Sequence, residues 1–344
     1  MKIVMDFDSN LSLFWRKTHM FEFLIKKLKA NPRKIVFTEG TDPRILEASA
    51  RLLSGTFLTP VLVGNVDEVQ KAAEDIGFNI RGAEIIDPAT FADMDKMVDE
   101  MVALRKGKMS PEQCRAALMQ GNYFGTMLVK MGYADALLGG ATYSTADTVR
   151  PALQIIKTKP GSKIVSSCFI MVRDSATGAR DVLAMADCAI NIKPNEDELV
   201  EIAIETAATA KVFGVDPKVA FLSYSTKGSG KGEDVDKMRN ACAKAKEVMV
   251  GIPVDGEMQF DAAVSPKVAE TKCKGSKVAG YANTFIFPDI NAGNIGYKIA
   301  QRLGGFDAYG PILLGLNAPI NDLSRGCNAQ EVYSMAIITA ALAD

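Results

Sequence analysis

Residues 34–64 of the sequence, KIVFTEGTDPRILEASARLLSGTFLTPVLVG, decide the fold class. The apolar run Lys34–Thr38 predicts a buried strand, Asp42–Ser54 the helix after it, and Pro60–Gly64 the next strand. The same alternation continues as far as Leu138. Strands that alternate with helices of this length indicate βαβ units, and therefore a mostly parallel sheet covered on both faces.

The segment Lys157–Ser162, KTKPGS, predicts a linker, because proline and glycine adjoin there between two patterned regions. Beyond it, Lys163–Arg173 and Asp181–Ala189 predict an antiparallel hairpin with its turn at Asp174–Arg180. A chain of 344 residues suits two domains of roughly 150 to 200 residues each. Residues 1–19 precede the first clear amphipathic helix and are expected to be an N-terminal extension.

Charge and cysteine content argue against several classes of protein. Lys and Arg number 40 against 41 Asp and Glu, so no excess of positive charge attracts nucleic acid or an anionic membrane. The six cysteines include no CxxC pair, a pattern typical of reduced, buried thiols. The single histidine, His19, argues against a Ser–His–Asp or Cys–His catalytic set and against a histidine-rich metal site. We expect no metal site.

The N-terminal sequence and the apolar runs predict a soluble, cytoplasmic protein. Asp6 and Asp8 stand where a signal peptide needs an apolar segment. No apolar run approaches the roughly 20 residues of a membrane span.

The segment Asn317–Glu331, NAPINDLSRGCNAQE, is a polar loop ahead of the last predicted helix. Ser324 and Arg325 adjoin in it, with Asp322 before them and Glu331 after them. Because backbone N–H groups and the dipole at a helix start favour an anion, these side chains could hold a phosphoryl group and move one proton. The alternative is structural, since Glu331 is also placed as the N3 residue of a capping box.

A second candidate loop, GGATYSTAD at residues 139–147, lies between a predicted strand and a predicted helix. Open α/β sheets bind ligands at such positions. In the functional interpretation Ser144 and Thr145 contact phosphate, with Arg150 one turn further on. In the structural one this is a plain βα loop with a hydroxyl cap.

A third loop, YSTKGSGKG at residues 224–232, is rich in glycine and lysine. It is not a Walker A loop, because GxxxxGK[ST] would need glycine at Ser225 and Ser or Thr at Gly232. Lys227 and the bare backbone amide of Gly228 still suit a phosphate or diphosphate. A solvated basic loop is the alternative.

Two asparagines, Asn291 and Asn294, stand at the start of a helix predicted after the strand-like run 278–288. They are either helix caps or uncharged donors suited to a pantetheine amide or a carbonyl. The strand Tyr309–Leu316 then leads back to the Ser324 loop, and we include Tyr309 among the expected substrate contacts.

Read together, six colinear segments resemble the phosphate acetyltransferase (phosphotransacetylase) family, which exchanges acetyl-CoA and phosphate for acetyl phosphate and CoA. The segments are KIVFTEGTDPRILEA (34–48), GGATYSTADTVRPALQIIKTKPG (139–161), ADCAIN (186–191), STKGSGKGEDVDK (225–237), FPDINAGNIGYKIAQRLGG (287–305) and PINDLSRGC (319–327). The resemblance covers residues 20–343 and does not extend to residues 1–19.

The resemblance implies two α/β/α domains with mostly parallel sheets and a cleft between them, an isocitrate-dehydrogenase-like architecture. Residues 20–159 and 313–344 would form the first domain, and residues 160–312 the second. It also implies a homodimer with coenzyme A or acetyl-CoA, acetyl phosphate and phosphate as substrates, and no tightly bound cofactor.

By motif, the family's serine–arginine pair falls on Ser324 and Arg325. Its two other functional arginines fall on Arg150, in TVRPAL, and on Arg105, in ALRKGK. The carboxylate proposed as general base is usually Asp in SRGCxxxD, and Glu331 stands at that position here.

The implied mechanism is direct thiolate attack in a ternary complex. We expect Glu331 to accept the CoA thiol proton, Ser324 to stabilise the developing oxyanion, and Arg325 to hold the leaving phosphate. An exposed carboxylate is a weak base, so the site must desolvate Glu331. Asp322 is the rival base, and Cys327 as an acyl-enzyme nucleophile is the competing scheme.

One further departure concerns Tyr143, which stands where many relatives have His. Three other functions stay open. Phosphate butyryltransferase would use a longer acyl group. An NAD-dependent β-decarboxylating dehydrogenase needs a GxGxxG motif that no strand here precedes convincingly. A CoA- or nucleotide-binding protein would lack the chemistry altogether.

Overall fold

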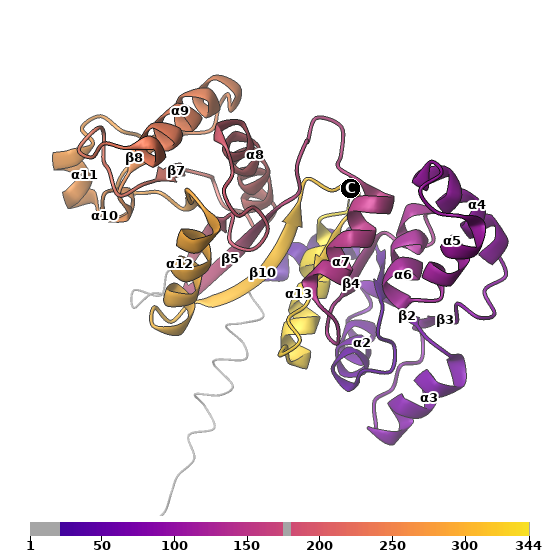
Figure 1. Cartoon of the computed structure of the whole chain (residues 1–344). Coiled ribbons are helices and arrows are strands. Elements are labelled where there is room, and N and C mark those ends of the chain that lie inside the picture. Colours follow the sequence, from indigo (N-terminus) through magenta and orange to yellow (C-terminus); the bar gives the residue numbers. More distant parts are fainter. Residues whose placement is uncertain (1–20, 175–179, 344) are drawn as a thin grey trace, which may run out of the picture.

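The computed structural model describes residues 21–174 and 180–343. The predicted N-terminal extension and residues 175–179 of the predicted hairpin turn lie outside the described residues. Two sheets, one of five strands and one of six, organise the described chain (Figure 1). The predicted α/β class with two mostly parallel sheets is confirmed.

The five-stranded sheet has the order β11-β4-β1-β2-β3, and each pair of neighbours is parallel. Its strands are β1 (Arg33–Phe37), β2 (Leu58–Val63), β3 (Glu84–Ile86), β4 (Ala136–Gly139) and β11 (Ile320–Asp322). Its helices are α2 (Pro43–Gly55), α3 (Val66–Asp75), α4 (Met94–Arg105), α5 (Pro111–Leu118), α6 (Gly121–Lys130), α7 (Thr145–Pro151), the π-helical turn η1 (Ala152–Ile156) and α13 (Ala329–Ala341).

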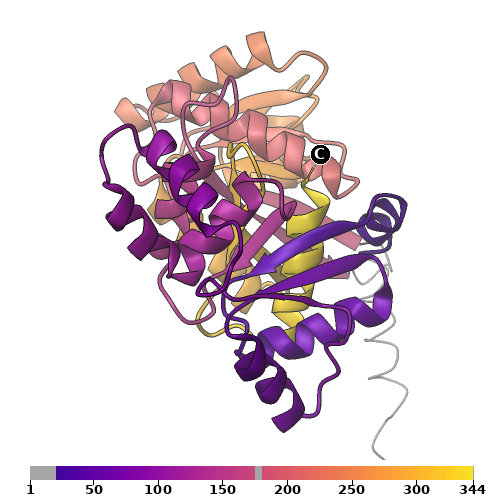
Figure 2. The same ribbon diagram turned by 90° about the vertical axis from the view of Figure 1, so that its right-hand side faces the viewer.

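Side chains along β1 alternate between two buried layers, as a strand covered on both faces requires. Ile35 and Phe37 belong to the apolar cluster of α2 and α13, whereas Val36 belongs to that of α4, α5 and α6. Helices therefore lie on both faces of this sheet, an arrangement visible when the molecule is turned (Figure 2).

The six-stranded sheet has the order β10-β5-β6-β9-β7-β8, in which β5 runs antiparallel to β10 and β6 and the other neighbours are parallel. Its strands are β5 (Ser166–Asp174), β6 (Arg180–Ala186), β7 (Val219–Leu222), β8 (Val254–Met258), β9 (Thr284–Ile286) and β10 (Asp307–Leu314). Its helices are α8 (Glu196–Val212), α9 (Glu233–Val248), α10 (Phe260–Val264), α11 (Pro266–Lys272) and α12 (Ile290–Arg302). The β5–β6 pairing confirms the predicted antiparallel hairpin.

The chain passes between the two sheets twice, and the two crossing segments pair with each other. Thr158 and Leu316 form an isolated antiparallel bridge, and Lys159 N donates to Gly315 O at 2.9 Å beside it. The predicted domain boundaries lie next to these crossings and stay a prediction.

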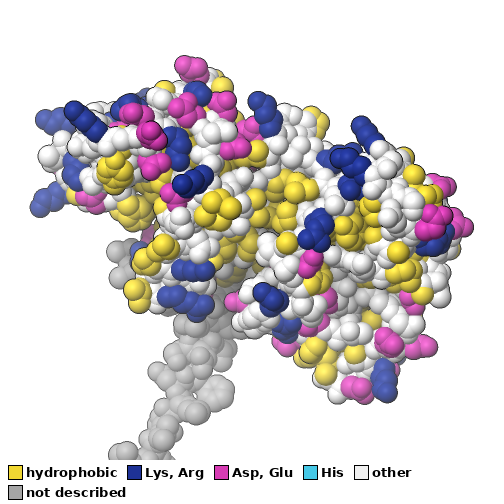
Figure 3. Space-filling model, viewed as in Figure 1, with side chains coloured by type: hydrophobic (Ala, Val, Ile, Leu, Met, Phe, Trp, Pro, Cys, Tyr) yellow, Lys and Arg dark blue, Asp and Glu magenta, His cyan; other side chains and the backbone are white. Residues whose placement is uncertain are grey.

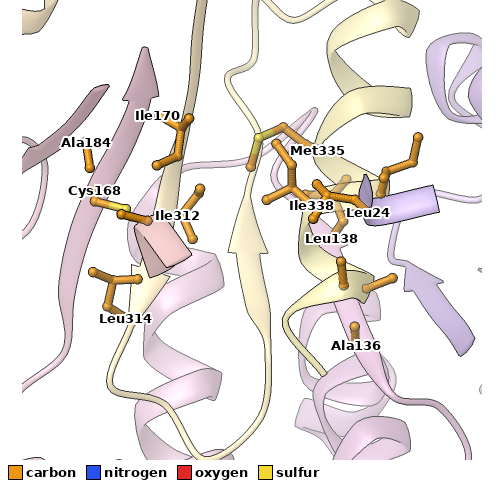
Figure 4. Packing of buried hydrophobic residues seen from close by; sticks show 14 of the residues in the cluster. Leu24, Ala136, Leu138, Cys168, Ile170, Ala184, Ile312, Leu314, Met335 and Ile338 are labelled. Carbon is orange, nitrogen blue, oxygen red and sulfur yellow. The ribbon is translucent and has the colours of Figure 1, made fainter. Parts of the chain in front are cut away.

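One buried apolar cluster extends from the six-stranded sheet to the last helix. Ile312 of β10 lies beside Cys168 and Ile170 of β5, and Met335 and Ile338 of α13 belong to the same cluster (Figure 4). Helix α13 is therefore packed into the core, and this packing fixes the end of the loop that precedes it.

The run 278–288, predicted as one strand, forms only the three residues of β9, and the short helices α10 and α11 were not predicted. The cause lies at Gly280, whose φ is +81°. A Cβ atom there would meet Pro266 Cα at 2.8 Å, so the backbone turns tightly against α11 instead of extending.

The face shown in Figure 3 carries charges of both signs without a large field of either. Within the part of the chain that the structure describes, no helix combines the length and the apolar character that crossing a bilayer needs.

Candidate active site

The carboxyl ends of β11, β4 and β1 lie side by side, because these strands are parallel neighbours. Asp322 ends β11, Gly140 follows β4, and Glu39 comes two residues after β1. Loops that follow adjacent parallel strands form the usual ligand crevice of an open α/β sheet. The residues at this edge are therefore candidates for the active site.

A cleft of about 410 Å³ opens beside this edge. The loop after β11 and the start of α13 form one wall, and β5, β10 and α12 of the six-stranded sheet form the other. The side chains and backbone that border it belong to Phe169, Tyr297, Lys298, Gln301, Arg302, Ala308, Tyr309, Gly310, Pro311, Asp322, Leu323, Ser324, Gly326, Cys327, Glu331 and Met335. The expected cleft between the two sheets is thus present, and it contains Ser324, Glu331 and Tyr309 from the predicted site.

Ser324 and Arg325 are both exposed, and Ser324 borders the cleft. Cys327 N donates to Ser324 O at 2.9 Å, and Gly326 N donates to Ser324 Oγ at 3.3 Å. Because Ser324 Oγ accepts in this contact, its own hydrogen stays available for a ligand. Arg325 stands next to it but does not border the cleft.

Glu331 borders the cleft and also caps α13. Its Oε2 accepts from Asn328 N at 3.0 Å, and Asn328 Oδ1 accepts from Glu331 N at 2.9 Å, so the capping box is formed. The side chain is exposed. The protein's own packing therefore does not supply the desolvation that a strong base at Glu331 would require.

Asp322, the rival base, has the opposite environment. Only 2% of the residue is exposed, and its two oxygens accept from Thr145 Oγ1 and Thr148 Oγ1, each at 2.6 Å. Burial raises the pKa of Asp322, and the two hydroxyl donors and Arg325 offset part of that rise. Asp322 is thus a buried carboxyl group that borders the cleft and that favours its neutral form more than an ordinary aspartate does.

Arg44 was not predicted as a site residue, yet it holds the Ser324 loop in place. Its Nη1 donates to the carbonyl oxygens of Arg325 (2.9 Å) and Cys327 (3.2 Å). Its Nη2 donates to Ala141 O at 2.9 Å and to Asp42 Oδ2 at 2.7 Å. One guanidinium therefore connects α2, the loop after β4 and the loop after β11. In the sequence, Asp42 and Arg44 gave only the start of a helix.

Glu39 and Tyr143 are both joined to Thr38 at this edge, which the sequence did not predict. Thr38 Oγ1 lies 2.6 Å from Glu39 Oε2 and 2.8 Å from the Tyr143 hydroxyl. Glu39 Oε1 accepts from the backbone N–H groups of Gly140 (3.0 Å) and Thr142 (3.1 Å). Burial raises the pKa of Glu39 and also that of Tyr143. Tyr143 therefore faces the strand ends and does not border the cleft.

Of the other predicted phosphate contacts, none borders the cleft. Ser144 Oγ donates to Asp147 Oδ2 at 2.7 Å, and the exposed Arg150 donates to Asp147 Oδ1 at 3.2 Å. Thr145 reaches the site only through Asp322. Arg105 lies in the last turn of α4, outside the cleft.

The glycine loop at residues 224–232 is occupied by the protein's own carboxylates. Gly228 N donates to Glu257 Oε1 at 2.6 Å. Lys227 Nζ donates to Asp255 Oδ1 at 2.5 Å, and Lys246 Nζ reaches the same oxygen at 2.8 Å. Neither Lys227 nor Gly228 borders the cleft, so the structure does not bring this loop to Ser324.

Asn291 and Asn294 both lie near the start of α12. Asn291 is exposed in the first turn. Asn294 Nδ2 donates to Cys188 O at 3.0 Å and ties α12 to the loop after β6. Neither borders the cleft, although α12 itself forms part of its wall.

Cys327 borders the cleft, but it is poorly suited to attack an acyl group. Burial raises the pKa of its thiol to about 11, even though the nearby Arg44 lowers it. Since the thiolate is the nucleophile, almost none of it is present at neutral pH.

Comparisons with known proteins agree with this geometry. Residues 19–340 match the model of the phosphate acetyl/butaryl transferase family. The chain belongs to this family. It is 53% identical over 324 residues to the phosphate acetyltransferase of Bacillus subtilis (strain 168), an alignment that covers 94% of this chain and 99% of that protein.

Two solved structures of similar proteins extend the phosphate acetyl/butaryl transferase comparison to three dimensions. A phosphotransacetylase from Streptococcus pyogenes superposes with a TM-score of 0.91 at 52% identity, and the EutD phosphotransacetylase from Staphylococcus aureus with 0.88 at 48%. Each comparison covers 94% of this chain and 98% of the other.

Proposed function

We propose that this chain is a phosphate acetyltransferase, which moves an acetyl group reversibly between coenzyme A and phosphate. The observation that carries the proposal is the cleft that Ser324 and Glu331 both border, in a chain 53% identical to a phosphate acetyltransferase over almost its full length. Its volume of about 410 Å³ falls within the range of small-molecule sites, which is roughly 300 to 1,000 Å³.

The first chemical requirement is an ionised thiol. A free thiol is only a few per cent ionised at neutral pH, so CoA needs a proton acceptor before it can attack. The thiolate attacks the carbonyl carbon of acetyl phosphate in a ternary complex. The new C–S bond forms as the C–O bond to phosphate breaks.

The second requirement is stabilisation of charge on the reacting groups. Ser324 Oγ has a free hydrogen to donate to the carbonyl oxygen as it becomes an oxyanion. Arg325 follows it in the same loop and holds the phosphate, whose geometry a guanidinium matches. Lys298 and Arg302 of α12 line the facing wall and suit the phosphates of CoA.

Glu331 is the proposed acceptor of the thiol proton. It is exposed at the cleft, so a long carrier can reach it, and a bound carrier would cover it and raise its basicity. Asp322 is less open to a thiol, because it is 2% exposed and both its oxygens already accept a threonine hydroxyl.

The test is release of phosphate from acetyl phosphate that depends on CoA, measured without metal or NAD and repeated with butyryl phosphate. The proposal expects rapid release with acetyl phosphate and none when CoA is omitted. Faster turnover of butyryl phosphate would instead identify a phosphate butyryltransferase. No CoA-dependent release with either substrate would overturn the proposal.

We also propose that the chain forms a homodimer, as the family resemblance implies. Ile295 and Ile299 of α12 and its C-cap residue Leu303 follow one another at intervals of four residues and are 58%, 54% and 85% exposed, so they form one apolar stripe. A second copy of the chain is the proposed partner of this stripe. Light scattering should give a dimer mass for the native chain and a monomer mass for Ile299→Asp.

A cytoplasmic location is the remaining part of the proposal. All six cysteines are buried and unpaired, which suits a reducing compartment.

A further inference from the structure

The loop that presents Ser324 is a tight turn. Ser324 O accepts from Cys327 N at 2.9 Å, which closes a four-residue β-turn with Arg325 and Gly326 at its centre. The carbonyl oxygens of Arg325 and Cys327 both accept from Nη1 of Arg44, at 2.9 and 3.2 Å. The turn is therefore completed by a side chain of α2, 281 residues from Arg325 in the sequence.

One peptide group connects Arg44 to the hydroxyl of Ser324. The carbonyl of Arg325 and the N–H of Gly326 belong to the same peptide bond. The carbonyl accepts from Arg44 Nη1 at 2.9 Å, and the N–H donates to Ser324 Oγ at 3.3 Å. In a trans peptide these two groups point in opposite directions. Arg44 therefore aims this N–H at Ser324 Oγ by holding the carbonyl on the side of α2.

Arg44 uses its whole guanidinium for such contacts. A guanidinium has five N–H donors, and five oxygen atoms accept from this one. They are Arg325 O and Cys327 O at Nη1, Ala141 O (2.9 Å) and Asp42 Oδ2 (2.7 Å) at Nη2, and Asp42 Oδ1 (2.9 Å) at Nε. Arg44 does not border the cleft. With every donor engaged, it can influence the reaction only through the residues that it holds.

Asp42 fixes Arg44 to the start of α2. It is the N-cap residue of this helix, and its Oδ1 accepts from Arg44 N at 2.9 Å in addition to the guanidinium. Two parallel bonds between an arginine and a carboxylate have a defined geometry. Ile45 and Leu46, the next residues of α2, are 0% exposed. The guanidinium therefore has a fixed position relative to the core.

We propose that Arg44 is a positioning residue for the acetyl transfer. By holding the Arg325–Gly326 peptide, it orients the Ser324 hydroxyl and the side chain of Arg325 toward the acyl phosphate. The proposal rests on the acetyl transfer proposed above. It gives Arg44 no contact with a substrate and no proton to transfer.

The Ser324 loop needs a restraint of this kind. Ser324 and Arg325 are both exposed and lie in a turn, outside any helix or strand. A catalytic group that is displaced by about 1 Å can lower the rate by about a hundredfold. The hydrogen bonds from Arg44 hold the turn on the side away from solvent, so they limit such displacements before a substrate binds.

Arg44→Lys tests the proposal, because lysine keeps the charge but cannot reproduce a planar fork of five donors. We expect kcat to fall by about thirtyfold, a part of what a displacement of about 1 Å can cost. KM for CoA should stay within about twofold of the native value, because the variant leaves the basic side chains of α12 in place.

Arg51→Lys is the matched control. Arg51 also lies on α2 and also reaches α13: its Nη2 donates to Gln330 Oε1 at 2.5 Å, and its guanidinium lies 4.4 Å from the centre of the Tyr333 ring. This variant weakens the packing of the same two helices and leaves the Ser324 turn intact. Its kcat should equal that of the native protein.

A double-mutant cycle separates positioning from a general loss of structure. In Ser324→Ala the hydroxyl that Arg44 orients is already absent. Adding Arg44→Lys to it should lower kcat by no more than about threefold, through Arg325, because effects that share one group do not add. Two effects that multiply in full, or a native kcat in Arg44→Lys, would overturn the proposal.

Asp42→Asn is the second variant, in case Arg44→Lys does not fold. Asparagine caps a helix as well as aspartate does. Its oxygen must still accept from Arg44 N, so its NH2 group faces Arg44 Nη2 and that bond is lost. The fall in kcat should be smaller and should again shrink in the Ser324→Ala background. If Arg44→Lys does not fold, a native kcat in Asp42→Asn would overturn the proposal.

Failure of this inference and failure of the proposed function give different results. A native protein without acetyl transfer defeats the proposed function. A fully active native protein whose Arg44→Lys variant is folded and equally active defeats the positioning role alone.

Discussion

Two loops of this chain have similar sequences and opposite environments. The segment around Ser324 and the glycine loop at residues 224–232 each combine a hydroxyl, a basic side chain and glycine after a strand. The first borders a cleft, whereas the second encloses Glu257 and Asp255 of the protein itself. The difference teaches that a loop with anion-binding groups does not always bind a ligand. The anion that it holds can be a carboxylate of the protein itself.

The largest expected effect separates the two loops by activity. Ser324→Ala and Arg325→Ala should each lower kcat by about a hundredfold or more, because each removes a donor that acts in the transition state. Lys231→Ala, an exposed lysine of the glycine loop, should leave steady-state kinetics unchanged. A comparable loss of kcat in Lys231→Ala would show that both loops take part in catalysis and would contradict the distinction between them.

Asp322 and Glu331, the two carboxyls of the segment Asn317–Glu331, should differ in how their variants respond to pH. Glu331→Gln loses the thiol base and should lower kcat by about a hundredfold at neutral pH. Its activity should recover as the pH rises, because the thiol then ionises without help. Asp322→Asn keeps the proposed thiol base at Glu331, so it should show a smaller deficit that a rising pH does not relieve. If Asp322→Asn recovers and Glu331→Gln does not, the roles are reversed.

Glu257 should matter for folding and not for catalysis. It is 1% exposed and accepts from Gly228 N and from the hydroxyl of the buried Ser225, so Glu257→Ala removes the partner of both donors. We expect a loss of about 3 kcal/mol in the free energy of unfolding, measured by denaturant titration. Glu247→Ala, an exposed residue of α9, is the control. A lower kcat per folded molecule in Glu257→Ala would show that this loop takes part in turnover.

Asp255 should make the stability depend on acid. Burial raises its pKa, but hydrogen bonds from Lys227, Lys246 and Ser276 outweigh burial and lower the pKa to about 2. Because the pKa of Asp255 in the folded protein lies below the ordinary value of 3.8, its ionised form stabilises the fold at pH values above 3.8. This stabilisation is lost as the pH falls from 3.8 to about 2. Asp255→Asn should remove roughly 2 kcal/mol of that dependence. An acid unfolding curve identical to the native one would exclude this contribution.

The smallest expected effect is that of Cys327→Ala. The raised pKa of this buried thiol leaves it protonated at neutral pH, so kcat should stay within about twofold of the native value. An inactive but folded variant would support the acyl-enzyme scheme, in which the nucleophile is the thiolate of Cys327 and not that of CoA.

The fold was largely predictable because its signal is local. Apolar runs such as Lys34–Thr38 and caps such as the capping box with Glu331 at N3 act within a few residues, and both are found where the sequence places them. The run 278–288 misled the strand prediction because an apolar stretch is buried whether or not it joins a sheet. The decisive contact there is between Gly280 and Pro266, which sequence spacing does not reveal.

The site was predictable only where its residues adjoin in sequence. Ser324, Arg325 and Glu331 stand in one segment; Ser324 and Glu331 border the cleft, whereas Arg325 does not, and the roles of all three stay predictions. Arg44 bonds to carbonyls more than 280 residues away, and Tyr143 meets Thr38 across 105 residues. Such contacts follow from the parallel order of β11, β4 and β1, which no local pattern specifies.

The order of the strands has a consequence for how the chain is made. Strand β11 forms an edge of the five-stranded sheet beside β4, yet it is synthesised after the other strands of both sheets, and α13 follows it. During translation the six-stranded sheet is complete while β4 is still an open edge with its backbone groups unpaired. Open strand edges invite pairing with other chains. A ribosome that stalls shortly before residue 320 would therefore hold a chain that lacks Ser324 and exposes the unpaired edge of β4, and chaperones bind such exposed surfaces.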